Sequence, residues 1–503
     1  MSVAKTPPPV SPLAHEPSAW AVRYREHRIP RRHRVFVNRN LRLTRIRAIG
    51  FDLDHTLAHY DPVPVEELAF DITKRKLVEE RGYPAEILDL RYDPQFVIRG
   101  LVVDKKRGNC LKMDYFNYVA RGVHGLSPLR AEERRRAYRS SRIRVGHENY
   151  ASVDTLFHLP EVYLYLSVVE LLERRKGSPL PDYTQLYEDV RRMIDEAHAD
   201  GSLKSVITSS LDRHIRVDQE LRTALEEFRR AGKMLFLLTN SDWRYTDALL
   251  RFILERGRGA PAHWSEIFDF VVVEARKPTF YTSTDAPSPV PEAEALGLKT
   301  PAVRGGHAAY LERALGAAGE HVLYFGDHTY GDILQSKKVM GWRTAMLVPE
   351  LEREIAVTQE HAKEFYRLGR LSGERHHLEI DKAAIGREFR RMTLMMQDGG
   401  EAGPDPARRL ELATRLQAIP DEIAAIDQQA AELLREIETL RTRIDRAYNA
   451  HWGSLFREGN ESSRFGHQLK DFACVYTARV SNFLHYPWNY YFQSPVSYMP
   501  HDF

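Results

Sequence analysis

Short apolar runs of strand length recur along the chain, separated by segments that look helical. The runs are 233–238 (KMLFLL), 268–275 (FDFVVVEA), 321–327 (HVLYFGD) and 342–348 (WRTAMLV). Continuous apolar runs of this length are typical of parallel strands buried on both faces. Segments 241–256 and 331–341 are predicted helices, the first with Ser241 or Asp242 as its N-cap. This alternation predicts an α/β domain with a doubly wound, Rossmann-like sheet.

One more apolar-leaning run, residues 45–53, lies far upstream of the others. We predict that it is the first strand of the same domain and that a large, mainly helical insertion follows it. The insertion contains the amphipathic segments 159–175 and 187–204, and the Pro/Gly/Ser-rich segment 281–306 is a predicted loop. We therefore expect a disordered lead at 1–22, an arm with the first strand at 23–60, and the insertion at 61–230. The core is expected at 231–349, and 350–503 is expected to be a helical region that packs on the core or on other subunits.

The C-terminal region carries a heptad pattern. Its apolar positions are Leu416, Ile419, Ile423, Ile426, Ala430, Leu433, Ile437, Leu440 and Ile444. Steps of three and four residues predict a coiled-coil segment, with Pro420 in the first turn of the helix. The seam fits a contact between subunits or an antiparallel hairpin with a neighbouring helix of the same chain, and both alternatives stay open. The aromatic-rich end of the chain is expected to dock on its own domain or on a partner.

Composition excludes several classes of protein. The formal net charge is only +3 over 503 residues, which argues against a general polyanion binder. Ten arginines lie between Arg23 and Arg47, where a folded arm or a subunit contact is favoured over a nucleic-acid arm. Cys110 and Cys474 are the two cysteines and are expected to be free thiols of a reducing compartment. No apolar run reaches the ~18–20 residues that cross a bilayer, so we expect a cytoplasmic protein without a membrane or nucleic-acid partner.

The first strand ends in two carboxylates, in the stretch FDLDHTLA. Side chains alternate along a strand, so Asp52 and Asp54 are expected on the same side. Two neighbouring carboxylates repel unless a cation or a proton lies between them. His55 should point to the opposite side and is interpreted as a neighbour of the chemistry and not as a catalyst.

Polar residues follow the other predicted strands as well. They are Thr239, Asn240 and Ser241 after the second strand, Arg276 and Lys277 after the third, and Asp327 and Asp332 after the fourth. Ligands of open α/β sheets bind at the carboxyl ends of the strands, so these groups should converge. Several carboxylates suit Mg²⁺, and a lysine with a hydroxyl suits a phosphate group. One carboxylate can attack phosphorus while another moves a proton.

The four pieces DLDHT, LTNSD, EARKP and GDHTYGD resemble the motifs of the haloacid-dehalogenase superfamily of aspartate-based phosphatases. The resemblance implies that Asp52 is the nucleophile and Asp54 the acid/base. It also implies a phosphate site at Thr239, Asn240, Ser241 and Lys277. It further implies a Mg²⁺ site at Asp52, Asp54 and Asp327, with Asp332 orienting Lys277 or metal-bound water.

Longer segments sharpen this resemblance to the cytosolic purine 5′-nucleotidase family. They are HRVFVNRNL, FDLDHTLAHY, TNSDWRYTD, EARKPTFY, GDHTYGDILQSKK, WGSLF and MPHD. The resemblance implies Mg²⁺-dependent hydrolysis of purine nucleoside 5′-monophosphates such as IMP and GMP through an aspartyl-phosphate, or transfer of the phosphate to another nucleoside. It also implies that the insertion is a helical cap and that the enzyme is a homotetramer.

The cap residues that match the family's substrate positions are Phe157, His158, Arg191, Asp195, His198 and Lys204. Arg191, Asp195 and His198 share one helix face by their spacing. The alternative is a solvated face with an Arg–Asp pair, and an aromatic residue at Phe157 that belongs to the core. His158 stands where the family commonly has Asn, and Ala199 where an aromatic residue is common, so the base preference stays open. Other functions compatible with the sequence are a phosphatase for another phosphomonoester and a non-catalytic scaffold or nucleic-acid binder.

Overall fold

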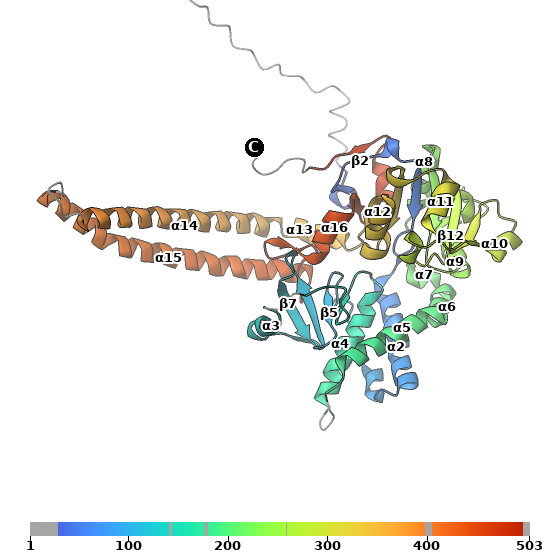
Figure 1. Ribbon diagram of the computed structural model, residues 1–503, viewed down its shortest axis with the longest axis horizontal. Coiled ribbons are helices and arrows are strands. Elements are labelled where there is room, and N and C mark those ends of the chain that lie inside the picture. The colour runs from blue at the N-terminus through green and yellow to red at the C-terminus, as the bar shows by residue number, and fades with distance from the viewer. Residues whose placement is uncertain (1–28, 140–142, 176–179, 258, 398–404, 496–503) are drawn as a thin grey trace, which may run out of the picture.

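The computed structural model describes residues 29–139, 143–175, 180–257, 259–397 and 405–495. The predicted disordered lead, 1–22, and the closing MPHD motif lie outside these ranges. No helix in the described part of the chain is long and apolar enough to cross a membrane. Figure 1 shows a central sheet flanked by helices, a second lobe below it, and a long helical hairpin that extends to one side.

The core is a nine-stranded sheet in the order β1-β19-β16-β15-β3-β11-β12-β14-β13. The five predicted strands are confirmed as β3 (Ala48–Phe51), β11 (Met234–Leu238), β12 (Phe270–Val273), β15 (Val322–Gly326) and β16 (Arg343–Leu347). All five run parallel to one another. The α/β class with a central parallel sheet is therefore confirmed, and β3 lies at its centre between β11 and β15.

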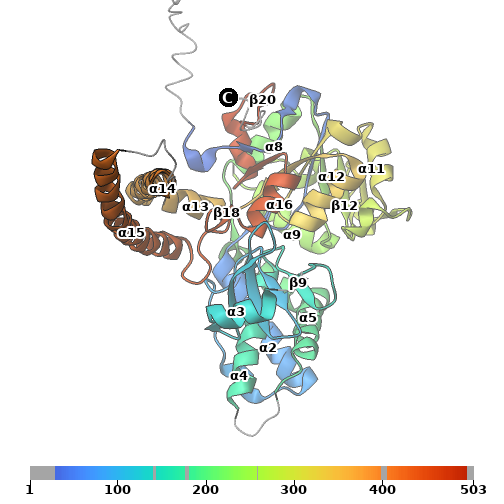
Figure 2. The same cartoon turned by 60° about the vertical axis from the view of Figure 1, so that its left-hand side comes forward.

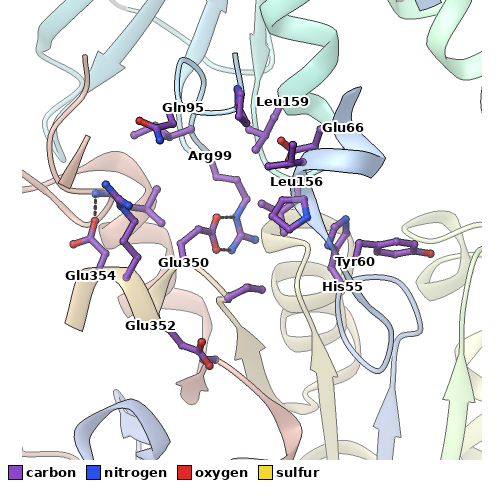
Figure 3. Close-up of a pocket in the computed structure, with 18 of the residues that line it drawn as sticks. His55, Tyr60, Glu66, Gln95, Arg99, Leu156, Leu159, Glu350, Glu352 and Glu354 are labelled. Atoms are coloured by element: carbon purple, nitrogen blue, oxygen red, sulfur yellow. Dashed lines mark hydrogen bonds and ion pairs between the residues drawn. The ribbon is translucent and has the colours of Figure 1, made fainter. Parts of the chain in front are cut away.

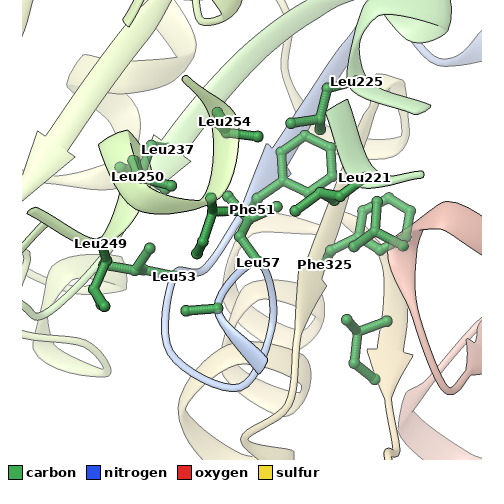
Figure 4. Packing of buried hydrophobic residues seen from close by; sticks show 14 of the residues in the cluster. Phe51, Leu53, Leu57, Leu221, Leu225, Leu237, Leu249, Leu250, Leu254 and Phe325 are labelled. Carbon is green, nitrogen blue, oxygen red and sulfur yellow. The ribbon is translucent and has the colours of Figure 1, made fainter. Parts of the chain in front are cut away.

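The two faces of the sheet bury separate apolar clusters because side chains alternate along each strand. Phe51, Leu237 and Phe325 face the helices α8 (Leu221–Arg230) and α9 (Trp243–Leu254), as Figure 4 shows. Phe236 and Tyr324 face the other way, toward Trp342 and the helix α11 (Ala308–Leu315). Helices on both faces explain why these strands are apolar throughout.

Two local predictions about the core need correction. Segment 281–306 is not only a loop: it forms the short edge strand β13 (Ser288–Pro289), the helix α10 (Pro291–Ala295) and the strand β14 (Ala302–Arg304). β14 pairs in parallel with β12, a long-range contact that turn-forming composition does not reveal. The predicted helix 331–341 begins with a π-helical turn, Thr329–Leu334, before α12 (Gln335–Met340).

The insertion leaves and re-enters the core through a two-stranded hinge. β4 (His59–Tyr60) pairs antiparallel with β10 (Ile215–Arg216), so both ends of the insertion lie side by side. α8 follows β10 and packs on the core sheet, so the insertion ends at the hinge and the boundary expected at residue 230 is too late. We call residues 61–214 the cap.

The cap combines helices with a sheet that the sequence did not predict. Its helices are α2 (Pro62–Arg81), α3 (Ala131–Tyr138), α4 (His158–Arg174), α5 (Tyr183–Ala199), α6 (Ser202–Ser209) and α7 (Leu211–His214). The antiparallel sheet has the order β8-β7-β6-β5-β9. Its strands are β5 (Val102–Asp104), β6 (Asn109–Met113), β7 (Val119–His124), β8 (Ser127–Pro128) and β9 (Tyr150–Ser152). α2, α4 and α5 share one apolar core with this sheet.

Glu66 of α2 gives the cap a pH-dependent stability. Its carboxyl is buried and accepts a 2.8 Å hydrogen bond from the Tyr92 hydroxyl, and burial raises its pKa from 4.5 to about 8. The unfolded chain therefore releases this proton at a lower pH than the folded protein. Folding stability is then lost as the pH rises from about 4.5 to about 8, at roughly 1.4 kcal/mol per pKa unit.

We expect Glu66→Gln to match the wild type in thermal unfolding near pH 5 and to exceed it by several degrees near pH 8.5. The amide keeps the hydrogen bond from Tyr92 but never ionises. Glu67→Gln, on the adjacent exposed position, is the control and should show no such divergence. Parallel melting curves for wild type and Glu66→Gln across this pH range would contradict the expectation.

The two ends of the described chain fold together. β1 (Phe36–Val37) pairs with β19 (Val475–Thr477), and β2 (Leu41–Arg42) pairs with β20 (Tyr491–Phe492). The part of the arginine-rich segment that is described is therefore a folded arm on the C-terminal segment. The aromatic end docks on its own chain, since Phe483 and Phe492 are buried in the core.

The C-terminal helices form an intrachain hairpin. α13 (Leu351–Glu360) leads into α14 (Ala362–Gln397), which packs along α15 (Pro406–Tyr448) in Figures 1 and 2. The heptad residues Ile437, Leu440 and Ile444 of α15 pack with Leu371 of α14. The seam thus meets a neighbouring helix of the same chain, and a subunit contact stays a prediction. Pro420 lies inside α15 and not in its first turn, because the helix begins at Pro406 after its N-cap Asp405.

Candidate active site

The candidate site lies where the strand order changes direction. β3 has β11 on one side and β15 on the other, and Asp52, Thr239 and Asp327 follow these three strands directly. The carboxyl ends of parallel strands at such a switch point are the usual ligand site of open α/β sheets. All three residues are buried. The predicted convergence of the strand ends is therefore present in the structure.

Lys277 forms ion pairs with two of the predicted acids, Asp52 and Asp332. Its Nζ lies 2.8 Å from Oδ1 of Asp52 and 2.7 Å from Oδ1 of Asp332, and it donates to the Tyr324 hydroxyl at 2.9 Å. Burial works against the charged ammonium, but Asp332 and Asp52 outweigh it and raise the pKa of Lys277. The lysine is therefore held as a cation beside the carboxylate that the sequence predicts to be the nucleophile.

The loop before Lys277 has an unusual backbone. Glu274 and Arg276 have φ angles of 48° and 60°, a region that residues other than glycine rarely occupy. Asn240 holds this loop: its Oδ1 accepts from the Lys277 amide at 2.6 Å and its Nδ2 donates to the Lys277 carbonyl at 3.1 Å. Asn240 is thus hydrogen-bonded to both backbone groups of Lys277, and its place at the phosphate stays a prediction.

Three carboxylates form a cluster that suits a hard cation. Oxygens of Asp52, Asp327 and Asp332 all lie within 4.8 Å of one another. Gly326 makes room for this, because a Cβ there would lie 2.4 Å from the Cβ of Asp332. Oδ2 of Asp327 is buried without a hydrogen-bond partner in the described part of the chain.

The pKa values of these acids also favour a cation site. Burial, then Asp332 and Asp54, raise the pKa of Asp52 to about 8 against the opposing effect of Lys277. Burial and Asp332 also raise the pKa of Asp327 well above its usual value. Ionising all three buried acids beside one lysine would leave excess negative charge, which Mg²⁺ would neutralise. The residues present therefore fit the predicted cation.

Asp54 lies outside this acid cluster, although the sequence placed it among the metal ligands. Its carboxylate accepts hydrogen bonds from the Tyr60 hydroxyl at 2.5 Å and from Ser241 Oγ at 2.8 Å. Tyr60 also contacts the Tyr245 hydroxyl at 2.9 Å. Asp54 thus has an environment of neutral hydroxyls, unlike Asp52. Ser241, expected at the phosphate, is engaged by this carboxylate.

Part of the predicted substrate set faces the loop that carries Asp54. The ring of Phe157 lies 4.6 Å from that of His55 and 5.6 Å from that of His198, centroid to centroid. His198 donates from Nδ1 to the Ile194 carbonyl at 2.8 Å, and burial lowers its pKa, so the ring is neutral at pH 7. His55, which lies between Asp54 and Thr56 in the sequence, has a φ angle of 55°. Phe157 and His198 therefore bring the cap onto the loop that carries Asp54.

The other predicted substrate residues are engaged elsewhere. Arg191 pairs with Asp195 at 3.2 Å and with buried Glu161 at 2.8 Å, and the Asp195 side chain is 61% exposed. Lys204 pairs with Asp242 of the core at 2.8 Å. His158 is largely buried, and burial lowers its pKa to about 3. The structure thus contains the Arg–Asp pair of the alternative interpretation, while the role of these residues in substrate binding stays a prediction.

Sequence reasoning missed Arg99, which joins cap and core beside the site. Its fully buried guanidinium forms a two-point pair with Glu350, at 2.7 and 2.6 Å, and donates to the Asp327 carbonyl at 2.9 Å. Tyr60, Tyr245 and Tyr324 were also missed, although each contacts a predicted site residue or its hydroxyl partner. Arg99 lies in a loop without periodicity, so no local pattern marks it.

Comparison with known proteins identifies a family and several related sequences. The model of the 5′ nucleotidase family matches residues 35–503. A 5′-nucleotidase domain-containing protein of Dictyostelium discoideum is 27% identical over 491 residues, covering 93% of this chain and 75% of that protein. 5′-Nucleotidase domain-containing protein 2 of Rattus norvegicus is 28% identical over 492 residues, covering 93% of this chain and 80% of that protein.

Among solved structures, a predicted phosphoglycolate phosphatase from Haemophilus somnus is similar at 14% identity with a TM-score of 0.27. It covers 60% of this chain and 86% of that protein. By class, the protein is a phosphoric monoester hydrolase. More particularly, since the family model spans nearly the whole sequence, the chain belongs to the 5′ nucleotidase family.

Proposed function

We propose that the enzyme is a Mg²⁺-dependent 5′-nucleotidase for purine nucleoside monophosphates of the IMP and GMP type. The observation that carries the proposal is the Asp52–Lys277–Asp332 arrangement at the switch point of the sheet. It places a carboxylate beside a buried cation that can neutralise a phosphate group. Phe157 offers an aromatic face for a base beside the same loop.

In this mechanism an Oδ of Asp52 attacks phosphorus, and the bond to the ribose 5′-oxygen breaks. Asp54 gives its proton to that leaving oxygen. Asp54 then takes a proton from the water that attacks the aspartyl-phosphate, which releases phosphate and restores both carboxyl groups. A nucleoside hydroxyl in place of water would give phosphate transfer instead. Mg²⁺, held by Asp52, Asp327 and Asp332 with Asp54 as a further predicted contributor, would neutralise charge on the phosphate oxygens.

The environments of the two acids fit these different tasks. Lys277 keeps a cation next to Asp52, which favours the ionised form that attacks. Asp54 accepts bonds only from hydroxyls in the described structure, and such partners tolerate either protonation state. Pairs of carboxylates whose surroundings differ are the usual way to assign nucleophile and acid/base.

The test is a substrate panel assayed for phosphate release, with Mg²⁺ and after its removal by EDTA. IMP, GMP, AMP, CMP and glucose 6-phosphate would be compared by kcat/KM. We expect the highest kcat/KM for the purine 6-oxo nucleotides, IMP and GMP. EDTA should abolish turnover until Mg²⁺ is restored. If kcat/KM is low for every nucleotide and high for the sugar phosphate, the result favours the alternative, a phosphatase for another phosphomonoester. Salt-sensitive RNA binding without phosphatase activity would instead favour a scaffold or nucleic-acid binder.

Tyr60→Phe tests the proton-transfer role of Asp54. Removing the hydroxyl deletes the 2.5 Å bond that orients this carboxylate, so we expect kcat to fall by about tenfold, with a shifted limb in its pH profile. KM should change little, because the hydroxyl does not contact the proposed phosphate or base sites. Tyr118→Phe, an exposed tyrosine of the cap, is the control. A lower kcat with an unchanged pH profile would mean that Tyr60 is only structural.

We also propose a cytoplasmic homotetramer. The family resemblance supports this assembly, and the exposed flank of the α14–α15 hairpin offers surface for a contact between subunits. Light scattering of the full chain measures the oligomer directly. A monomer at micromolar concentration would exclude the tetramer without affecting the proposed chemistry.

A further inference from the structure

One cavity among the described residues lies apart from the candidate active site. It has a volume of about 510 Å³ and lies where the hinge, the cap, the core and the C-terminal region meet (Figure 3). Part of its wall is formed by His59, Tyr60 and Arg216 of the hinge and by Val217, which follows β10. Asp52, Asp54, Asp327 and Lys277 do not line it, so it is separate from the reacting groups. Its size is typical of sites for small organic ligands.

Apolar side chains form much of the lining of the cavity, and two buried polar atoms in it lack partners among the described residues. Leu156, Leu159, Val97 and other apolar side chains line the wall. Nε2 of His55 and Nε2 of His59 are buried in the described structure without a hydrogen bond. Buried polar atoms without partners are uncommon in folded proteins, and a ligand is one of the ordinary explanations.

Four arginines and four glutamates line the cavity. Three of its arginines are paired: Arg99 with Glu350, Arg216 with Asp61 and Arg479 with Glu352. Arg353 instead donates to the carbonyls of Tyr448 and Ala447, and no carboxylate within the described ranges pairs with it. An exposed guanidinium that lines a cavity and has no carboxylate partner in the described ranges is suited to an acidic head group.

Two lining residues connect the cavity to the predicted catalytic acids. Tyr60 borders the cavity with its ring and donates its hydroxyl to Asp54 outside it. Arg99 borders the cavity and donates to the main-chain carbonyl of Asp327. The hinge strands β4 and β10 form another part of the same wall. A molecule bound there would contact the cap, the core and the hinge at once.

We propose that this cavity is a regulatory site for a small amphipathic anion, with its apolar body inside and its acidic group on Arg353. The bound molecule fixes the cap relative to the core through the hinge and so changes turnover at the separate active site. A ligand shifts such an equilibrium only by its different affinity for the two arrangements.

The probe for this site is 1-anilinonaphthalene-8-sulfonate, an apolar aromatic anion whose fluorescence rises on burial. The full-length protein would be titrated, together with Arg353→Gln and Val217→Phe, which both change the lining of the cavity. Arg435→Gln, on an exposed face of α15 away from the cavity, is the matched control. Circular dichroism and thermal unfolding would establish that each variant is folded.

We expect one saturable site per chain, with Kd raised about tenfold by Arg353→Gln, because one charge-assisted contact is lost. Val217→Phe should also raise Kd by at least that factor, by filling the cavity, and Arg435→Gln should leave it unchanged. The assignment would be overturned if neither lining variant, or only one of them, weakens binding. It would also be overturned if the control variant weakens binding equally.

The regulatory part has its own readout. Hydrogen exchange of the amides of β4 and β10 should slow when the probe is bound to wild type and should not change in Val217→Phe. This measurement needs no substrate, so it stands even if the proposed nucleotidase activity fails. Saturable binding without protection of the hinge would overturn the proposed regulation.

Discussion

Asp52→Asn is expected to lower kcat by at least about 10⁴-fold while leaving the protein folded. The neutral amide cannot attack phosphorus, and the loss of a nucleophile usually removes most of the catalytic rate. The fold should persist because Asn has nearly the volume of Asp and its amide oxygen can still accept from Lys277, now 2.8 Å from the carboxylate. Phosphate release from IMP with Mg²⁺ measures the effect.

Two further observations separate nucleophilic catalysis from a binding role. Acid quenching of the wild type during turnover, followed by peptide mass spectrometry, should find phosphate on the peptide that contains Asp52, and the variant should carry none. Asp285→Asn, an exposed acid of the loop after β12, is the matched control and should keep full activity. An Asp52→Asn protein with substantial phosphate release would show that this carboxylate is not the nucleophile.

Lys277→Met should lower kcat/KM by about 10³-fold and move the remaining activity to higher pH. The loss follows from removal of a preorganised cation beside the reacting phosphate. The pH shift follows because Lys277 opposes the rise in the pKa of Asp52, which already stands at about 8. Without the ammonium that pKa rises further, so the ionised nucleophile forms only at higher pH. The pH dependence of kcat/KM measures both effects.

The control for this variant is Lys299→Met, which removes an exposed lysine of the same domain. It should leave both the rate and the pH profile unchanged. A Lys277→Met enzyme with a lower rate and an unshifted profile would mean that the lysine only binds substrate. A fully active variant would remove Lys277 from the site.

The strands of the core could be predicted because each one is marked by its own short stretch of sequence. The runs that became β3, β11, β12, β15 and β16 are apolar throughout, and helices on both faces of the sheet require this. The polar residues at their ends converge because parallel strands end on one edge. Asp52, Lys277, Asp327 and Asp332 were therefore predictable as neighbours from spacing and strand order alone.

The missed features depend on contacts between distant parts of the chain. The strands of the cap sheet are short, and their pairing is not visible in any alternation of apolar and polar residues. Arg99 matters because Glu350 and the Asp327 carbonyl come from the other lobe. The carboxylate of Asp54 lies outside the acid cluster because Tyr60, on the hinge, and Ser241, after β11, donate hydrogen bonds to it.

The position of β19 has a consequence for biosynthesis. This strand, Val475–Thr477, covers the flank of β16 in the central sheet and pairs on its other side with β1 near the start of the described chain. The ribosome must therefore make the cap, the core and the whole helical hairpin before the sheet can be completed. Until then the open edge of β16 offers unpaired backbone groups to other chains. Nascent or truncated chains that end before residue 475 should thus depend on chaperones and aggregate, even though they already contain every residue proposed for catalysis.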